Sequence, residues 1–294
     1  MNHIEINETI AKALLPKREI NGHKGTFGRA FAYIGSGKYP GAAHLATEAM
    51  LRGGCGYTEV ASEADVISGL LAKFPEVIYT ALPATEALTE REINLLAEKS
   101  SAADATLIGS GSGCTEALAL LTIKLTALDT NKPIILDADA LNAISRYGNT
   151  DSILHSAKRP VILTPHEMEF SRISKQCLDE IKADRVKVAE DFAKKYACTL
   201  VLKGYGTVIT NGIKTYINPT GSTALSKGGS GDALAGLMTS LIASSNMPII
   251  DIAALACYIH GLAGDRLSDV FSKFGVTPSD LPKEMAKIIR SIQD

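Results

Sequence analysis

Short apolar runs that alternate with helical patterns constrain the fold of this chain of 294 residues more than any other feature. Each run ends in glycine or polar residues, which is typical of strands buried on both faces of a parallel sheet. The sequence therefore predicts an α/β fold with a mostly parallel central sheet and helices on both faces. The predicted strands are residues 30–34, 57–61, 105–108, 134–136, 161–163 and 199–202.

The first two strands enclose a helix with an unusually flat side. Pro40 starts this helix after the break at Gly35-Ser36-Gly37, and the glycine-rich run 53–56 ends it. Small residues at helical spacing let another backbone approach closely, and the whole unit reads as β-α-β of the parallel type. The residues on the flat side are Ala42, Leu45, Ala46, Ala49 and Gly53.

An antiparallel element is attached late in the chain. Residues 207–210 and 214–217 flank Asn211-Gly212, a strong hairpin signal. Further helices are predicted at residues 116–125, 184–196, 250–264 and 278–292. Because no linker-like run divides the chain and 46% of its residues are hydrophobic, we expect one domain, residues 1–294, rather than two small ones.

Composition argues against several classes of function. The formal net charge is −2, lysine and arginine are scattered, and there is no tryptophan, which disfavours a nucleic-acid-binding surface. Residues 1–16 lack the features of a signal peptide and no apolar run reaches the length of a bilayer span, so we expect a cytoplasmic protein with no membrane segment. The five cysteines lie far apart without a Cys-x-x-Cys pair, as is typical of reduced thiols.

The turn Lys227-Gly228-Gly229-Ser230-Gly231-Asp232 carries the strongest functional signal. Its glycines permit a sharp turn, and the apolar run after it predicts a helix whose free N–H groups and positive dipole end point back at the turn. Such a turn suits a phosphate, which Asp232 would repel unless it exchanges a proton with a hydroxyl group. The plainer alternative is a loop whose Asp232 only caps the helix.

Polar groups also follow other predicted strands, at the edge where ligands bind to open parallel sheets. The spaced glycines of residues 109–113 would bring amides close to a phosphate or a ribose, or they form a plain turn. Asp137 and Asp139 end the next strand. Asp139 is equally well explained as a helix N-cap, whereas Asp137 is better placed to reach a bound magnesium ion through water.

Two more strand ends carry ionisable side chains. His166 follows Thr164-Pro165 and precedes Glu169, which favours a substrate contact over a purely structural histidine. Lys203-Gly204-Tyr205-Gly206-Thr207 offers an ammonium group and flexible amides, either as a cradle for a nucleotide or as a tight turn with a solvated lysine. Residues 24–30 either cover a ligand or form a surface loop. His260, near Asp265, is expected to be packed in the core.

Together these motifs resemble the ADP-dependent NAD(P)H-hydrate dehydratases, carbohydrate-kinase-related members of the ribokinase-like superfamily that repair hydrated nicotinamide cofactors. The resemblance implies a ribokinase-like three-layer sandwich with a small antiparallel element. The matching segments span nearly the whole chain in order: residues 23–25, 39–43, the glycine turn at 109, and residues 136–142, 164–166, 201–204, 218–232 and 258–261.

The resemblance also implies roles for individual residues. Asp232 would be the catalytic acid and base. The anion hole would consist of Gly229, Ser230 and Gly231. The nucleotide would bind to Lys203, Gly204, Tyr205, Gly206, Thr207 and Gly231, and the hydrated cofactor to Ala42, Ala43, Gly111, His166 and Asp232.

The implied reaction is a carbon–oxygen lyase reaction: ADP-dependent dehydration of the S-epimer of hydrated NADH or NADPH, with release of AMP and phosphate. Asp232 would deprotonate the ring hydroxyl, which then accepts phosphate from the nucleotide and leaves with it. The expected co-substrate is ADP or ATP with Mg²⁺, contacted through water by Asp137 and Glu169. The family also implies a homo-oligomer, a tetramer, with no nucleic-acid or membrane partner.

The sequence departs from the family pattern in two turns. Members commonly carry Pro and Leu where Ser110 and Ser112 stand, and Pro-Gly where Glu167-Met168 stands; the second change is expected to loosen the turn that carries His166. Many relatives also have a fused N-terminal epimerase domain, for which this chain has no room.

Two other functions remain open. The same Asp232 and anion hole suit a kinase of a small alcohol or sugar hydroxymethyl group, whose product would be a stable phosphomonoester. The altered glycine turns suit a catalytically silent nucleotide-binding protein.

Overall fold

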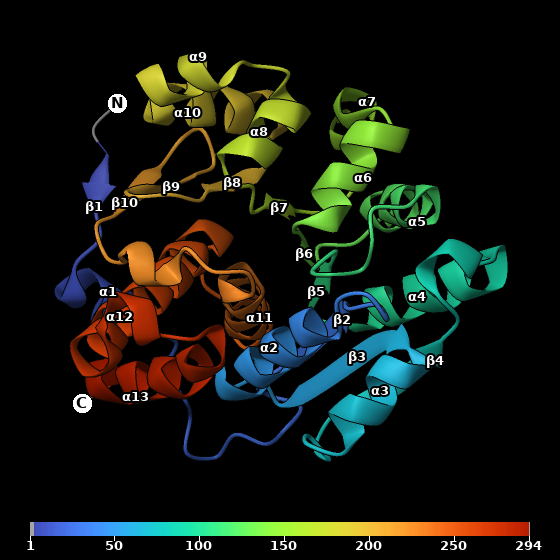
Figure 1. Cartoon of the computed structure of the whole chain (residues 1–294), viewed down its shortest axis with the longest axis horizontal. Coiled ribbons are helices and arrows are strands. Elements are labelled where there is room, and N and C mark those ends of the chain that lie inside the picture. The colour runs from blue at the N-terminus through green and yellow to red at the C-terminus, as the bar shows by residue number, and fades with distance from the viewer. Residues whose placement is uncertain (1–2, 294) are drawn as a thin grey trace.

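The computed structural model describes residues 3–293, and a ten-stranded sheet runs through it in the order β1-β10-β9-β8-β7-β6-β5-β2-β3-β4 (Figure 1). Strand β9 is antiparallel to both of its neighbours, and all other pairs are parallel. The strands are β1 (Ile4–Glu5), β2 (Arg29–Tyr33), β3 (Tyr57–Glu63), β4 (Ile78–Leu82), β5 (Ala105–Ile108), β6 (Ile134–Leu136), β7 (Val161–Leu163), β8 (Thr199–Leu202), β9 (Thr207–Thr210) and β10 (Thr215–Asn218).

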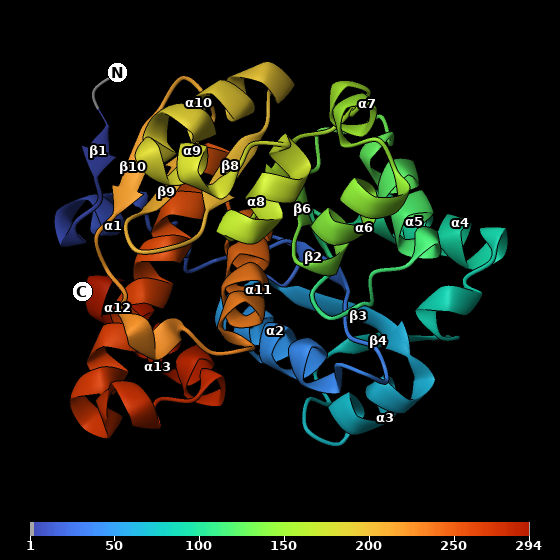
Figure 2. The ribbon, with the colours of Figure 1, turned by 45° about the horizontal axis from the view of Figure 1, so that its top comes forward.

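Helices cover both faces of this sheet, so the molecule has three layers (Figures 1 and 2). One face carries α1 (Glu8–Leu14), α2 (Pro40–Arg52), α3 (Ala64–Leu71), α11 (Ser230–Ala243), α12 (Ile249–Gly275) and α13 (Leu281–Gln293). The other carries α4 (Glu90–Ala102), α5 (Glu116–Thr126), α6 (Asp139–Tyr147), α7 (Thr150–His155), α8 (Glu167–Ser174), α9 (Leu178–Ala183) and α10 (Arg185–Tyr196). Single 3-10 turns lie at Thr85–Ala87, Thr223–Leu225 and Pro278–Asp280.

Each central strand contributes to two separate cores. In β2, Ala30 and Ala32 pack toward α2 and α11, whereas Phe31 and Tyr33 pack toward α4 and α5. Side chains of a strand alternate between faces, so a strand covered on both sides must be apolar at every position. This is why the short uninterrupted apolar runs identified the strands correctly.

The predicted strands, the hairpin at Asn211-Gly212 and the helices are confirmed, with differences at their ends. The helix predicted at residues 250–264 extends further along α12 and is interrupted by a kink at Ser272, where φ is +61°, shortly before the element ends at Gly275. The sequence prediction missed β4, because this edge strand is largely half-exposed and lacks a continuous apolar run. It also missed β1, which is only two residues long and joins the sheet beside β10.

The order of the strands sets the position of α11. The chain adds β3 and β4 to one side of β2, and then continues on the other side with β5. Ligands of open α/β sheets bind near such a reversal, beyond the carboxyl ends of the strands. Helix α11 packs against both β2 and β5, so its first turn lies close to this point.

Helices α2 and α11 approach each other unusually closely. A side chain at Gly236 of α11 would collide with the carbonyl oxygen of Ala46 in α2. A side chain at Gly53, the C-cap of α2, would overlap Ser240 of α11, because a Cβ added at Gly53 would lie 2.5 Å from the Ser240 Cβ. The small residues predicted on the flat side of α2 therefore do bring two backbones together. Within residues 3–293, no helix combines the length and apolar character needed to cross a bilayer.

Candidate active site

A cavity of about 640 Å³ opens at the carboxyl ends of β6, β7 and β8. The residues that follow these strands line it: Asp137 and Ala138, then His166 and Glu169, and finally Lys203 to Tyr205. The opposite wall is formed by the segment from Thr220 to Asp232, together with His260 and Gly261 of α12. A polar, concave site at this edge is where an α/β fold binds its ligand.

The glycine turn at the start of α11 presents free donors to this cavity. Gly229 is the N-cap of the helix and has φ +106°, a conformation that favours glycine. A side chain there would also lie 2.5 Å from Leu45 Cδ1. Among the described residues, no backbone acceptor is bonded to the N–H groups of Gly229 or Gly231, whereas that of Ser230 donates to the Lys227 carbonyl at 3.2 Å. The turn thus keeps amides free for an anion.

Ser230 adds a donor that the sequence pattern alone does not reveal. The residue is only 4% exposed, and its hydroxyl oxygen is buried without a hydrogen-bond partner among residues 3–293. An unpaired buried hydroxyl is destabilising unless a ligand or water completes it. Next to free amides at a helix N-terminus, this unpaired group supports an anion site.

Asp232 is the third residue of α11 and faces the same cavity. Its carboxylate makes no hydrogen bond within the part of the chain that the structure describes, and the N-cap position belongs to Gly229, so the alternative of a simple helix cap is wrong. Burial raises the pKa of Asp232 to about 7, repulsion from Asp137 adds to the effect, and Lys203 partly offsets it. A carboxyl group with such a pKa can accept and return a proton near neutral pH.

Lys203, at the start of the turn of residues 203–207, lies beside the carboxylates of Asp137 and Glu169. Its Nζ lies 3.1 Å from Asp137 Oδ1, and a Cβ at Gly231 would be 3.3 Å from the same nitrogen. Burial lowers the pKa of Lys203, but the Asp137 and Glu169 carboxylates outweigh this and raise it overall. The ammonium group is therefore charged and points at the anion turn, and the alternative of a solvated lysine is wrong.

Asp137 has a full set of hydrogen bonds. It is 1% exposed, and its carboxylate accepts hydrogen bonds from Ser110 Oγ (2.9 Å), Thr164 Oγ1 (2.7 Å) and Lys203 Nζ (3.1 Å). Asp139, by contrast, is not the N-cap of α6, because Ala138 occupies that position. The Asp139 carboxylate instead accepts the Gly113 N–H at 2.9 Å and ties the glycine turn of residues 109–113 to α6.

His166 caps helix α8 with its imidazole ring. Nδ1 accepts the N–H groups of Met168 (3.1 Å) and Glu169 (3.2 Å), while Glu169 Oε2 accepts the His166 N–H at 2.9 Å. This reciprocal arrangement satisfies three donors at the start of the helix. The expectation that Glu167-Met168 loosens the turn is therefore wrong. The ring of His166 remains half-exposed at the cavity.

The residues predicted to bind the hydrated cofactor fall into two places. His166 and Asp232 line the cavity, whereas Ala42, Ala43 and Gly111 lie outside its lining. Gly111, at φ +68°, is crowded against Ala42, since an added Cβ would lie 2.5 Å from the Ala42 Cβ. Ala43 is fully buried against Gly35. In the nucleotide turn, Lys203, Gly204, Tyr205 and Thr207 line the cavity and Gly206 completes the turn behind them.

Comparison with known proteins decides the family. Residues 32–288 match the carbohydrate-kinase-type family described as NAD(P)H-hydrate dehydratase. The chain belongs to this family. It is 31% identical to the ADP-dependent (S)-NAD(P)H-hydrate dehydratase of Bacillus subtilis over 286 residues, which cover 96% of both chains. A crystal structure of the ADP/ATP-dependent NAD(P)H-hydrate dehydratase of Bacillus subtilis, co-crystallized with ATP/Mg²⁺, superposes with a TM-score of 0.85 at 30% identity and covers 99% of each chain.

A second type of dehydratase relative is longer. The bifunctional NAD(P)H-hydrate repair enzyme Nnr of Thermofilum pendens is 33% identical over 294 residues, 99% of this chain but 55% of the relative. The chain thus spans about half the length of such bifunctional relatives. Its ribokinase-like fold, expected from the sequence, is shared with the solved members.

The serine departures from the dehydratase pattern have a structural explanation. Ser110 and Ser112 are both fully buried. Ser110 Oγ donates to Asp137, and Ser112 Oγ donates to the Tyr33 carbonyl at 3.2 Å. The two hydroxyls therefore serve the packing of the glycine turn and the charge of Asp137, and neither is available to a ligand.

Sequence reasoning missed part of the cavity wall and misread one loop. Ser222, Thr223, Leu225 and Ser226 line the cavity; they lie in the segment 218–232 that resembles the family, but the sequence analysis assigned them no role. His260 is buried as expected, yet it also lines the cavity, where Nε2 donates to the Ser230 carbonyl at 2.9 Å. Burial lowers the pKa of His260 to about 4, so its ring is neutral. Residues 24–30 do not cover the site, because Gly28 packs against Ala243 at the far end of α11.

Proposed function

We propose that this chain catalyses the ADP-dependent dehydration of the S-epimer of hydrated NADH or NADPH, releasing AMP and phosphate. The observation that carries the proposal is Asp232: a carboxyl group with a pKa of about 7 at the cavity, three residues after the N-cap of a helix with free amides. The family match supports the substrate class, and the Bacillus subtilis relative bears the name of this activity.

The chemistry follows from the poor leaving ability of hydroxide. Ionised Asp232 removes the proton of the ring hydroxyl, and the resulting oxygen attacks the terminal phosphorus of ADP while the bond to AMP breaks. Phosphate then leaves from the ring carbon with the electron pair of the broken carbon–oxygen bond, which hydroxide could not do unaided. The adjacent ring carbon gives up a proton to solvent, and its bonding pair forms the ring double bond. Both steps move negative charge past the turn of Gly229, Ser230 and Gly231, so the free amides and the Ser230 hydroxyl stabilise each transition state.

Lys203 supplies the positive charge on the nucleotide side. Its ammonium group lies beside Gly231 and is fixed by Asp137, which accepts three hydrogen bonds. An ammonium group held in this way neutralises phosphate charge without reorganising during the reaction. The nucleotide would therefore lie along residues 203–207, with its terminal phosphate over the turn of α11.

Magnesium would not be held by a protein cage. Among the residues that the structure describes, no three histidine, cysteine, aspartate or glutamate side chains are arranged to hold a metal ion. Asp137 already accepts three hydrogen bonds, and Glu169 accepts the His166 N–H. A magnesium ion bound to nucleotide phosphates would neutralise their charge. Its contact with Asp137 and Glu169 through water remains a prediction. The oligomeric state and the cytoplasmic location also remain predictions.

The decisive experiment follows reduced-nicotinamide absorbance after the protein is mixed with hydrated NADH, magnesium and either ADP or ATP. We expect the absorbance to return in step with the release of inorganic phosphate. The matched control is Asp232→Asn, which keeps the shape of the side chain. A stable phosphomonoester without recovered absorbance would favour a small-alcohol kinase instead, and nucleotide binding without any product would favour a silent binding protein.

A further inference from the structure

Arg185, the first residue of α10, lies beneath the turn of residues 203–207 without lining the cavity. Its Nη2 donates to the carbonyl oxygens of Leu202 (3.1 Å) and Lys203 (3.3 Å). One guanidinium group therefore holds the carbonyls of the last residue of strand β8 and of the residue that follows it. Because a peptide group is planar, holding the Lys203 carbonyl also sets the direction of the Gly204 N–H.

The guanidinium group also packs against the backbone of the turn. A Cβ at Gly204 would lie 2.8 Å from Arg185 Nη2 and 3.2 Å from Cζ, and Gly204 has φ +152°. On its other side the turn is closed by Thr207, whose Oγ1 donates to the Gly204 carbonyl at 2.8 Å. The conformation of Gly204 is thus held from below by Arg185 and from the side by Thr207.

Glu167 completes this arrangement. Its carboxylate pairs with Arg185 Nη1, and the two side chains are 31% and 18% exposed. Glu167 stands where members of the family commonly carry proline, directly after His166. The Lys203 N–H donates to the Pro165 carbonyl at 2.8 Å, so the ion pair and this backbone bond join the same two strand ends.

The arrangement is not optimal for stability alone. Arg185 Nε is buried and has no hydrogen-bond partner among residues 3–293. A buried unpaired donor is destabilising, and such groups in native structures call for an explanation. A role of Arg185 in orienting the turn of residues 203–207 provides such an explanation.

We propose that Arg185 and Glu167 form a brace that orients the turn of residues 203–207 for binding the adenine nucleotide. Both are positioning residues, since they act through the backbone of Leu202, Lys203 and Gly204. The proposal rests on the proposed function, because it takes the nucleotide to bind at this turn. It predicts an effect on nucleotide binding that is separate from the chemistry at Asp232.

The test measures the Kd of ADP by calorimetry, without the hydrated substrate, and then kcat and both KM values. For Arg185→Met we expect the Kd and KM of the nucleotide to rise about tenfold, because a turn displaced by a fraction of an ångström loses well-aligned hydrogen bonds. The KM of the hydrate and kcat should stay within about threefold of the wild type. Arg91→Met, a change at an exposed arginine on α4, is the matched control and should leave all values unchanged.

Two further variants keep the test informative. Arg185→Lys should resemble Arg185→Met, because an ammonium group lacks the planar fork that reaches two carbonyls and a carboxylate together. Glu167→Gln should raise the Kd of ADP about threefold, because it removes the charge of the ion pair but retains an acceptor. This milder variant carries the test if Arg185→Met does not fold.

The outcomes separate the two hypotheses. If the wild type binds neither ADP nor ATP, the proposed function is contradicted, and so is the proposal that the brace orients a turn for nucleotide binding. A wild type that binds ADP while folded Arg185→Met and Glu167→Gln bind it equally well would overturn the brace alone. A loss of kcat as large as the loss of nucleotide affinity would also overturn it, since a positioning role predicts a split between KM and kcat.

Discussion

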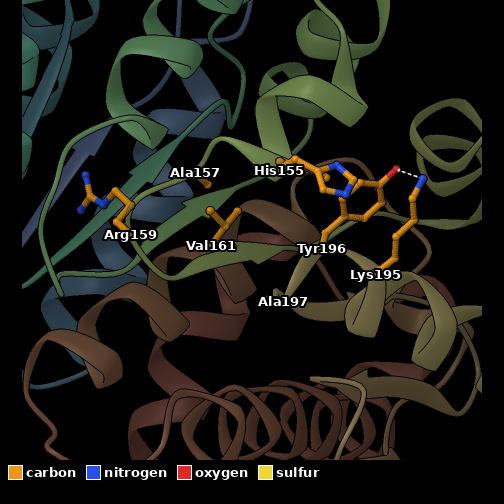
Figure 3. A pocket seen from close by; sticks show the side chains of 8 residues that line it. His155, Ala157, Arg159, Val161, Lys195, Tyr196 and Ala197 are labelled. Atoms are coloured by element: carbon orange, nitrogen blue, oxygen red, sulfur yellow. Dashed lines mark hydrogen bonds between the residues drawn. The ribbon is translucent and has the colours of Figure 1, made fainter.

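Buried charged side chains lie at both ends of the central strands, at the carboxyl ends (the carboxyl edge) and at the amino ends (the amino edge). The two sets differ in how their charges are balanced. At the carboxyl edge, Asp137, Glu169 and Asp232 surround the ammonium group of Lys203 beside a large cavity. At the amino edge, a cavity of about 200 Å³ is lined by His155, Lys195, Tyr196 and Arg159, among other residues (Figure 3). The guanidinium group of Arg159 points away from His155 and Tyr196 in that view.

Arg159 shows how the fold satisfies a buried charge that has no chemical task. It is 5% exposed, and its guanidinium donates to the Lys132 carbonyl (2.7 Å), the Ser100 hydroxyl (2.7 Å) and the Pro133 carbonyl (3.2 Å). Burial lowers its pKa to about 10, which still leaves it charged at neutral pH. No carboxylate pairs with it within residues 3–293.

The difference teaches that a cavity alone does not mark a reactive site. Each guanidinium nitrogen of Arg159 donates to an oxygen acceptor, so the fold itself satisfies this buried charge. At the carboxyl edge burial raises the pKa of Asp232 to about 7, and the carboxylates of Asp137, Asp139 and Glu169 add to this effect while Lys203 offsets part of it. A buried carboxyl group that has no hydrogen-bond partner among the described residues, beside open space, is the feature that separates the two sites.

The largest expected effect breaks the chemistry of the carboxyl edge. Asp232→Asn removes the proton acceptor while keeping size and polarity, so we expect kcat/KM for the hydrate to fall by at least about a hundredfold. Calorimetry with ADP checks that nucleotide affinity is retained. If the variant keeps more than a tenth of the activity, Asp232 is not the base, and the proposal that the carboxyl edge is the reactive one is contradicted.

The next effect belongs to the amino edge and concerns stability. Arg159→Met leaves buried carbonyls without donors, so we expect the free energy of unfolding in urea to drop by roughly 2–3 kcal/mol. Activity per folded molecule at a low temperature should be unchanged, because the residue lies at the opposite edge from Asp232. A folded variant with several-fold lower kcat would show that this edge is coupled to the chemistry.

A smaller effect comes from pH. Because burial raises the pKa of Asp232 to about 7, kcat/KM should fall about tenfold per pH unit below that value. The folded state binds this proton more tightly than the unfolded chain does, so the contribution of Asp232 to stability is present below about pH 4 and is lost as the pH rises through 7. Asp232→Asn should therefore be more stable than the wild type at pH 8 and equal to it near pH 4. Thermal unfolding at both pH values checks the sign, and the opposite order would contradict the raised pKa.

The smallest effect concerns the unpaired hydroxyl of Ser230. Ser230→Ala removes a group that has no protein partner, so stability should be unchanged or slightly higher. We expect kcat/KM to fall about three- to tenfold, because one donor to the migrating phosphate is lost. The matched control is Ser112→Ala, whose hydroxyl bonds the Tyr33 carbonyl and should affect stability instead. If Ser230→Ala is as active as the wild type, the Ser230 hydroxyl does not take part in the anion hole.

The parts of the fold that follow from local pattern were predictable. Buried strands such as Val161–Leu163 must be apolar on both faces, and the Asn211-Gly212 turn is set by two residues. Strand β4 was not predictable, because its half-exposed side chains show no continuous apolar run. The expectation of one domain over residues 1–294 stays a prediction.

The part of the site made by residues that are contiguous in the sequence was predictable. The part that depends on contacts between residues far apart in the sequence was not. The glycines and Asp232 lie together in sequence, so their combination could be read directly. The ion-pair partner of Arg185, Glu167, is 18 residues away, and its carbonyl acceptors lie at the end of strand β8 and directly after it, so no local pattern contains them. The buried orientation of Ser110 likewise depends on Asp137, which lies 27 residues further along the chain.

The contact between Gly236 and the backbone of Ala46 has a kinetic consequence. Two helices whose main chains touch cannot slide or separate without opening a gap, so α2 and α11 form a rigid pair. We expect arriving and departing molecules to pass the remaining rim of the cavity, which is made by the turn at 203–207 and the segment at 222–228. We expect the rate of product release to depend on the mobility of that rim.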